Sequence, residues 1–411
     1  MQKINIKPLD VLFFRDSRPM EGSFRGVGDN IPLPHAFNGV VRSVLTDMEN
    51  EKLRGSLLTA GPFFEYGGEV YFNAPQDLLL NGDGRVLYLE PRETKNEEAF
   101  LSNLPAGLSV ISANGIRPTK KNLGRFISKA GFEKYLDKEE LNASNFKNNS
   151  DFFSTENYIG IAIDPLTQTA ADEKFYSKST MRLNENARFT GLARFSRSLP
   201  ENAYVKFGGE ARCADFTSEE ISSPFLPRCG KIGSTRIKFV LLTPAIYKTW
   251  RPDWIDENNN VRILDGPGAK KLERLGAKGV QAGKPIKARL VGAKIDRPIA
   301  ISGYAAGGDK IQNRQDGFIM RKRDGIWQKE KDDKFYRGSK PLLFAVPAGS
   351  VYYLEAETPD DASKLADALN WHGERANPAS QSAGGEIKNI RSLLGEKGYG
   401  IGVCGNWDYL K

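Results

Sequence analysis

The sequence is poor in the residues that build metal sites, disulfides and nucleophilic catalytic sites. Its 411 residues include two histidines, His35 and His372, and three cysteines, Cys213, Cys229 and Cys404. So few histidines argue against a zinc site or a histidine-centred catalytic triad. An odd number of cysteines without paired spacing is typical of the reducing cytoplasm. We therefore expect no metal, no cofactor and a cytoplasmic location.

Long hydrophobic runs are also missing from the sequence. No stretch approaches the length of a membrane span, and the opening segment has no apolar run of the signal-peptide kind, so we expect no membrane partner. What is present is an ordinary folded composition, with 39% hydrophobic and 27% charged residues. The length favours two domains. A net charge of +8 favours a polyanionic partner.

The chain shows two cycles of similar elements, separated by a Ser/Pro/Gly-rich stretch at 222–234. The first cycle predicts a strand, a helix, a hairpin with a Gly-Gly turn and a second helix, at 3–14, 32–50, 62–75 and 119–137. The second cycle predicts three strands and a helix, at 236–247, 287–295, 342–357 and 360–371. Strand, helix, hairpin, helix and strand is the ferredoxin-like order. We predict an α+β fold with two ferredoxin-like domains, 1–233 and 234–411.

Glycines give the next signal. The glycine-rich loop 398–405 spaces Gly398, Gly400 and Gly402 two residues apart, which in a strand leaves one face without side chains. Such a face lets a phosphate chain approach the backbone amides, although a flexible hairpin or close strand packing gives the same pattern.

A second glycine cluster lies in the middle of the chain. The segment "VKFGGEARCADF" joins Gly208 and Gly209 to Arg212. We treat this cluster as a candidate ligand contact, and a β-bulge is the alternative.

Residues 156–190 predict a long hairpin. Ile159, Ile161 and Ile163 alternate, and Asp164-Pro165 breaks the strand. The return strand is aromatic and basic, and aromatic rings interleaved with cations suit unstacked bases and their phosphates. A hairpin packed on its own domain, with a solvated charged face, is the alternative.

Seven segments then carry a resemblance. They are "PLDVLFFRDSRPM", "LPHAFNGVVRSVL", "NYIGIAIDPLTQTAADEKFY", "KFGGEAR", "LLTPAIY", "VPAGSVYYLE" and "GYGIGVCGNW". Their order resembles that of one family over nearly the whole chain. This family is the third subunit of the type III-B (Cmr) CRISPR RNA-guided effector complex, in the RAMP superfamily.

The resemblance implies a fold and a role. It implies two ferredoxin-like, RNA-recognition-type domains, a protruding hairpin and a C-terminal glycine-rich loop. The implied role is non-catalytic: the subunit holds the 5′ handle of the CRISPR RNA and bridges the large polymerase/cyclase-like subunit to the first backbone RAMP subunit in antiviral defence. Contact with target RNA would be indirect. Two departures are Tyr304, where the family has a tryptophan after Ser302-Gly303, and a basic stretch, 307–340, that looks like an inserted solvated loop.

The residue types and the resemblance together give a predicted RNA-binding set. Arg15, Ser17 and Arg18 leave the first strand beside the start of the first helix, whose positive end favours a phosphate. Salt bridges to nearby carboxylates are the alternative for the two arginines. The set comprises Arg15, Ser17, Arg18, His35, Asn38, Arg42, Tyr158, Leu166, Phe175, Tyr176, Arg182, Gly208, Gly209, Arg212, Gly303, Tyr304, Gly398, Tyr399 and Gly400.

Three of these residues have a specific expected role or an open alternative. Asn38 and Arg42 are four apart and would share a helix face. His35 is either an RNA ligand or a hydrogen bonder at the start of the helix. Leu166 would act as a wedge between guide bases.

Two rival functions remain open. One is a metal-independent CRISPR RNA-processing endoribonuclease, for which His35 with Tyr304 or Lys120 could supply the base and the acid. The other is a structural adaptor that does not contact RNA directly.

Overall fold

The computed structural model describes residues 1–14, 24–26, 31–45, 57–81, 85–93, 104–105, 107–113, 123–195, 198–266, 281, 283–301, 304–306, 318–323, 326–331, 337–339, 342–370 and 394–410. For 24–26, 172–174, 176, 304–306, 318–323, 326–331 and 337–339, the description covers the backbone alone. The fold is mostly β with few helices, which confirms the predicted α+β class. No helix among the described residues is long and apolar enough to cross a membrane.

An eight-stranded sheet forms the N-terminal half, in the order β10-β9-β4-β3-β13-β1-β15-β14. Strand β1 lies in its interior because alternate residues such as Ile4 and Ile6 are buried on one face. Four adjacent strands of this sheet, β3-β13-β1-β15, have the strand order of a ferredoxin-like unit, and α1 lies between β1 and β3 in the chain. The elements of this half are β1 (Gln2–Pro8), α1 (Pro34–Ser43), β3 (Leu58–Tyr66), β4 (Glu69–Asn73), β9 (Phe126–Ser128), α3 (Lys129–Leu136), β10 (Phe146–Lys147), α4 (Asn149–Phe152), β13 (Ala187–Arg194), β14 (Asn202–Lys206) and β15 (Cys213–Glu220).

A four-stranded sheet forms the C-terminal half, in the order β17-β24-β16-β25. This is again the strand order of a ferredoxin-like unit, with α6 between β24 and β25. Helix α6 begins after Thr358, whose side chain accepts from the Asp361 N–H, and it buries residues at helical spacing against the sheet. The bounds are β16 (Arg236–Leu241), β17 (Ala288–Lys294), β24 (Val351–Ala356), α6 (Pro359–Leu369) and β25 (Gly402–Asn406).

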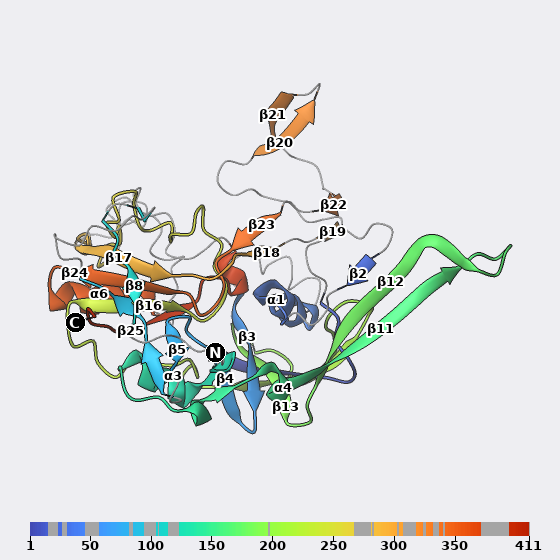
Figure 1. Cartoon of the computed structure of the whole chain (residues 1–411), viewed down its shortest axis with the longest axis horizontal. Coiled ribbons are helices and arrows are strands. Elements are labelled where there is room, and N and C mark those ends of the chain that lie inside the picture. Colours follow the sequence, from blue (N-terminus) through green and yellow to red (C-terminus); the bar gives the residue numbers. More distant parts are fainter. Residues whose placement is uncertain are drawn as a thin grey trace.

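A long hairpin projects from the N-terminal half (Figure 1). Its strands are β11 (Phe153–Ile163) and β12 (Ala170–Leu183), and β12 also pairs in parallel with β2 (Phe24–Gly26). This confirms the hairpin that the sequence predicts within 156–190. The return strand ends at Leu183, however, because β13 turns back into the large sheet.

The remaining strands form small antiparallel pairs. Hairpin β20–β21 occupies part of the basic stretch 307–340, where the sequence analysis expected a loop. The pairs are β5 (Leu78–Leu80) with β6 (Val86–Tyr88), β7 (Glu90–Pro91) with β8 (Ile111–Ser112), β18 (Ile299–Ile301) with β23 (Leu343–Ala345), β19 (Tyr304–Ala306) with β22 (Arg337–Ser339), and β20 (Phe318–Arg323) with β21 (Ile326–Lys331). Two 3-10 turns, η1 (Ala143–Asn145) and η4 (Gly395–Lys397), complete the described elements.

The two halves share one hydrophobic core. Helix α3 contacts β4 and β9 on one side and β25 on the other. The shared core contains residues of both halves, among them Phe72, Phe132, Val240 and Trp407. The halves are therefore packed as one body, although their sheets divide between Glu220 and Arg236.

A buried polar network crosses this shared core. Asp77 accepts hydrogen bonds from the Tyr135 hydroxyl at 2.7 Å and the Tyr353 hydroxyl at 2.9 Å. The Lys238 ammonium lies 3.4 Å from the centroid of the Tyr135 ring, on the ring face. Burial raises the pKa of Asp77 and lowers the pKa of Lys238 to about 8.

Two local predictions were wrong. The first strand ends at Pro8 rather than continuing to 14, although Leu12 bridges Met181. Within the predicted helix 119–137, Phe126–Ser128 is instead strand β9, and α3 covers only Lys129–Leu136, capped by the Ser128 side chain. Pairing with β4 and β10 explains the strand, because it buries Phe126 and Ile127 in the sheet.

Candidate nucleic-acid interface

A groove of about 1640 Å³ runs between α1, the large sheet and the C-terminal half. Its lining joins the start of α1 to residues 62–64 of β3 and to the β14–β15 turn. Residues 242–244, Asp296, Ile299 and Ala300 close it from the C-terminal half. Segments far apart in the sequence thus meet at one concave surface, which is where ligand sites preferentially form.

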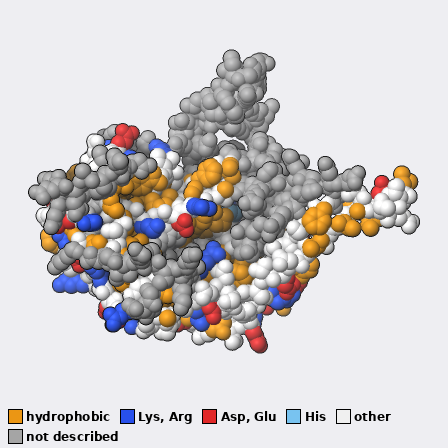
Figure 2. All heavy atoms as spheres, viewed as in Figure 1, with side chains coloured by type: hydrophobic (Ala, Val, Ile, Leu, Met, Phe, Trp, Pro, Cys, Tyr) orange, Lys and Arg blue, Asp and Glu red, His pale blue; other side chains and the backbone are white. Residues whose placement is uncertain are grey.

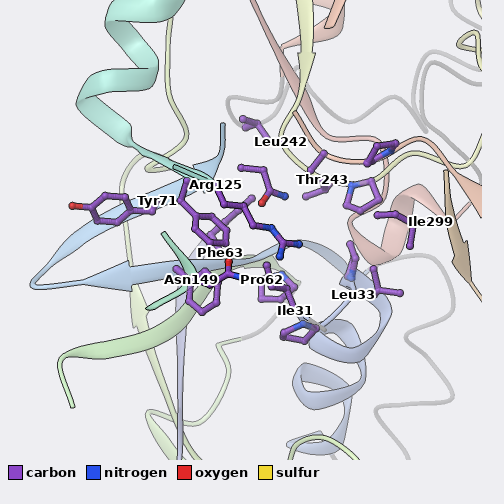
Figure 3. Close-up of a pocket in the computed structure, with 18 of the residues that line it drawn as sticks. Ile31, Leu33, Pro62, Phe63, Tyr71, Arg125, Asn149, Leu242, Thr243 and Ile299 are labelled. Carbon is purple, nitrogen blue, oxygen red and sulfur yellow. The ribbon is translucent and has the colours of Figure 1, made fainter. Parts of the chain in front are cut away.

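The groove combines an apolar floor with cationic and amide side chains. Pro62 and Phe63 belong to the floor, and Arg125 reaches between the groove walls (Figure 3). Lys206 is a second cation, and Asp296 is the single carboxylate among the described lining residues. Aromatic and apolar surface beside cations is suited to bases and phosphates of a single strand.

Two amide oxygens in the groove have no hydrogen-bond partner among the described residues. They are Oε1 of Gln76 and Oδ1 of Asn149, and both atoms are shielded from solvent. A shielded acceptor without a donor carries a cost, and a rotation of the side-chain amide toward the groove would let a ligand donor remove that cost. Exocyclic amino groups of bases and ribose 2′-hydroxyls are such donors.

The N-terminus of α1 lies in the same groove. Leu33, Pro34, His35 and Ala36 line it. The helix has no side-chain cap and no acidic residue in its first turn, so its positive dipole end is not neutralised locally. This arrangement favours a phosphate at the groove.

His35 is fixed by the C-terminal segment. Its Nδ1 lies 2.6 Å from the Tyr399 hydroxyl in a hydrogen bond, and the two rings are stacked with centroids 6.1 Å apart. The Tyr399 ring is fully buried, and burial raises the pKa of its hydroxyl well above the ordinary range. Tyr399 therefore positions His35 and does not itself present a surface to a ligand.

The structure corrects the predicted conformation of the glycine-rich loop. Gly398 and Gly400 lie in a turn with φ of 94° and 74°, and strand β25 begins only at Gly402. A Cβ on Gly398 would lie 2.9 Å from the Thr59 carbonyl oxygen. The Gly400 N–H donates to the Pro244 carbonyl. These glycines pack the turn against β3 and the C-terminal half, so the predicted open glycine face was wrong.

Gly208 and Gly209 form part of the turn between β14 and β15, not a bulge. The Gly209 N–H donates to the Phe13 carbonyl at 2.7 Å, and a Cβ on Gly208 would lie 3.1 Å from the same oxygen. Both glycines and Phe13 line the groove. The turn therefore holds the segment that follows β1, at Phe13, against the edge of the groove.

Asn38 and Arg42, which the sequence analysis assigned to RNA from a shared helix face, are not among the residues that line the groove. The Asn38 side chain is buried and donates to the Thr59 hydroxyl at 3.1 Å, which ties α1 to β3. Arg42 lies in the last turn of α1. Four-residue spacing places them along one helix face, but Asn38 packs toward the sheet.

Three predicted ligands lie together in a second place, at the base of the hairpin. Arg182 bonds Glu156 and, at 3.1 Å, Asp10, whose other oxygen lies 2.7 Å from Arg212. The Tyr158 hydroxyl donates to Glu156. The Val11 N–H and Arg182 hold the pKa of Asp10 below its usual range. Because carboxylates already pair with these cations, the cluster anchors the hairpin to the end of β1.

The outer hairpin exposes the other predicted contacts. Leu166 is almost fully exposed at the tip, and Phe175 is half exposed. Four predicted RNA-binding residues, Arg15, Ser17, Arg18 and Gly303, are not among the described residues. Of Tyr176 and Tyr304 only the backbone is described.

The structure thus brings His35, Gly208 and Gly209 to one groove and places Arg182, Arg212 and Tyr158 elsewhere. Sequence reasoning missed Arg125, Lys206, Gln76 and Asn149. Arg125 had a local signal, since it directly precedes the strand Phe126–Ser128. Among the described residues, no cluster of three or more His, Cys, Asp or Glu side chains is arranged to hold a metal ion.

Comparison with known proteins gives one family and several solved structures. Residues 4–407 match the family described as "CRISPR-associated protein (Cas_Cmr3)". A chain of the type III-B Cmr-beta complex bound to cognate target RNA and AMPPnP is 15% identical, covering 85% of this chain and 86% of that chain, with a TM-score of 0.41. A chain of the Csm3-Csm4 subcomplex of the type III-A interference complex is 11% identical, covering 87% and 93%, with a TM-score of 0.36. No curated protein matches the sequence.

Proposed function

The chain belongs to the Cas_Cmr3 family of CRISPR-associated proteins, and from this premise we propose that it holds guide RNA in the groove as a non-catalytic subunit of a type III-B effector complex. The RNA segment is the 5′ handle of the CRISPR RNA. In this role the chain bridges the large polymerase/cyclase-like subunit to the first backbone subunit. Its two sheets act as two ferredoxin-like units with the handle between them.

The groove is the observation that carries this proposal. Its two cations and the uncapped start of α1 supply positive potential for phosphates. The unpartnered oxygens of Gln76 and Asn149 supply acceptors for base or ribose donors. The net charge of +8 adds a general attraction for RNA.

A salt-dependence measurement tests the site. We expect Arg125→Ala and Lys206→Ala each to weaken binding of a CRISPR RNA and to reduce the slope of log affinity against log salt by about one counterion. Lys287→Ala is the matched control, because Lys287 is an exposed cation paired with Glu357 on the C-terminal half. Unchanged slopes for both groove variants, or an equal loss in the control, would refute the proposed site.

A second measurement separates the contribution of the neutral acceptors Gln76 and Asn149 from that of the cations. Replacing Asn149 with leucine removes a neutral acceptor, so the affinity should fall while the salt slope stays constant. Binding of a handle with 2′-deoxy sugars should show a smaller loss if the partner is a ribose hydroxyl. An altered slope would show that the substitution disturbs the cations instead.

The non-catalytic assignment is tested directly. His35, the candidate base of the rival endoribonuclease, has its Nδ1 bonded to a buried tyrosine hydroxyl. We expect the purified chain to leave handle-containing RNA intact. Cleavage by the wild type that His35→Ala abolishes would establish the endoribonuclease in its place.

A further inference from the structure

The projecting hairpin has two chemically different faces. Residues directly opposite in an antiparallel pair point to the same face, so the register β11–β12 assigns each side chain. One face carries the pairs Tyr158–Lys178 and Ser154–Arg182. The other face carries Ile159–Ser177 and Ile161–Phe175, with Ile163 further out.

The second face, which we call the isoleucine face, is apolar and open to solvent. The exposed fractions are 73% for Ile159, 52% for Ile161, 58% for Ile163 and 47% for Phe175, and Leu166 at the tip is 93% exposed. In Figure 2 the hydrophobic atoms form a band along the projecting hairpin. Contiguous apolar surface of this kind on a soluble protein marks an interaction site.

The composition of this face excludes a phosphate ligand. No lysine or arginine occurs between Tyr158 and Lys174, and the tip carries the carboxylate of Asp164. Branched aliphatic side chains also lack the flat ring that bases stack on, which leaves Phe175 as the one aromatic surface among the described residues of the face. The cations among the described side chains of the hairpin, Lys178 and Arg182, belong to the opposite face.

The edge of the hairpin is open as well. In the ribbon β11-β12-β2, strand β11 is at the edge, so one side of its backbone has no strand partner among the described residues. Edge strands that stay in water usually carry lysine or proline, whereas the segment 159–163 reads "IGIAI", with one irregularity in its pairing to β12 between Ile161 and Ile163. Such a segment is an association hazard unless another chain covers it.

The size of the face decides which chain covers it. A few exposed side chains provide on the order of a few hundred Å². A stable two-protein interface needs roughly 800 Å² from each partner. The face is therefore too small to hold a second copy of this chain alone, and it fits a partner that other contacts already keep close.

We infer that the isoleucine face docks an uncharged, apolar surface of a neighbouring protein subunit in the assembled ribonucleoprotein. This inference rests on the proposed function for the presence of such a neighbour. It assigns Phe175 and Leu166 to a protein contact, in place of the RNA contact that the sequence suggested. The hairpin then separates two partners, with protein on one face and RNA reaching at most the other.

Site-specific photocrosslinking in the complete complex tests the assignment. A benzoylphenylalanine at position 161 samples the isoleucine face, and the same probe at position 158 samples the charged face. We expect the adduct at position 161 to contain another subunit and to resist ribonuclease. Adducts at position 161 that ribonuclease removes, that contain a second copy of this chain, or that fail to form would overturn the inference.

A substitution test gives an independent readout. The triple variant Ile159→Thr, Ile161→Thr and Ile163→Thr keeps β-branched residues and removes apolar surface outside the core, so the isolated chain should melt at the wild-type temperature. Its retention in the complex should fall at least tenfold. Leu9→Thr, at another exposed aliphatic residue, is the control and should retain full assembly. Wild-type retention of the triple variant would refute the inference.

The two proposals fail separately. If Arg125→Ala and Lys206→Ala leave the slope of log affinity against log salt unchanged, and position 161 still gives a protein adduct, the RNA groove is rejected and the docking face is kept. If the two variants reduce the slope as expected, and ribonuclease removes the adducts at position 161, the RNA groove is kept and the docking face is rejected.

Discussion

The buried network between the two halves gives a prediction with a calculable magnitude. Asp77→Asn preserves size but removes the negative charge that compensates Lys238, and it weakens the bonds from Tyr135 and Tyr353. A hydrogen bond to a charged group contributes about 1.5–3 kcal/mol. Removing one member of a buried charge pair costs about 3–5 kcal/mol. Since asparagine retains one acceptor oxygen, we expect the free energy of unfolding to fall by about 3 kcal/mol.

A double-mutant cycle isolates the compensation between the two charges. Lys238→Met alone should also cost about 3 kcal/mol, because it leaves the buried Asp77 carboxylate uncompensated. The double variant removes both charges, so its cost should be smaller than the sum by about 1–3 kcal/mol. Denaturant unfolding followed by Trp407 fluorescence reports this region, because its ring lies 5.4 Å from the Tyr353 ring.

An exposed ion pair near the same network supplies the control. Asp408→Asn removes an exposed carboxylate paired with Lys138 at 2.9 Å and should cost at most about 1 kcal/mol. A coupling between Asp77 and Lys238 below about 0.5 kcal/mol would show that the carboxylate does not stabilise the buried ammonium. Separate transitions for the two halves would show that the shared core does not join them.

Three further predictions follow from single contacts. The folded state lowers the pKa of Lys238 from 10.5 to about 8, so the unfolded state binds more protons in this window. Stability relative to Lys238→Met should therefore rise by roughly 3 kcal/mol between pH 8 and 10.5, as measured by denaturant unfolding at each pH. Gly398→Ala should lower the free energy of unfolding by about 2 kcal/mol, because its Cβ would press on the Thr59 carbonyl at a positive φ; an unchanged thermal midpoint would contradict this. Tyr399→Phe should cost about 1 kcal/mol of stability, and it should lower guide-RNA affinity because the His35 ring loses this hydrogen bond, which a binding titration would detect.

Local patterns predicted much of the fold. The Gly-Gly turn between aromatic runs gave the β3–β4 hairpin, with its turn at Gly67 and Gly68. Alternation of isoleucines gave the long hairpin, and helical spacing of apolar residues gave α1 and α6. The family match over 4–407 confirms the resemblance carried by the seven segments. Each of these signals lies within one short stretch of chain.

Contacts between distant segments were beyond the sequence patterns. Glycines two residues apart occur both in a strand and in the turn at Gly398 and Gly400. The contact that distinguishes the two is with Thr59, which is far away in the sequence. Arg182 looked available to phosphates because Asp10, its partner, is 172 residues away. The two ferredoxin-like domains stay a prediction, with the observed strand orders in agreement.

The docking of the last segment onto α1 has a consequence for biosynthesis. Strand β1 pairs with β13 and β15, so the large sheet closes only after residue 220 has been made. The hydrogen bond between His35 and Tyr399 forms only when Tyr399 has been made, and β25 then completes the second sheet. Contacts of such long sequence separation form late in folding. A nascent or truncated chain therefore lacks a finished groove, and under the proposed function it would not yet hold guide RNA.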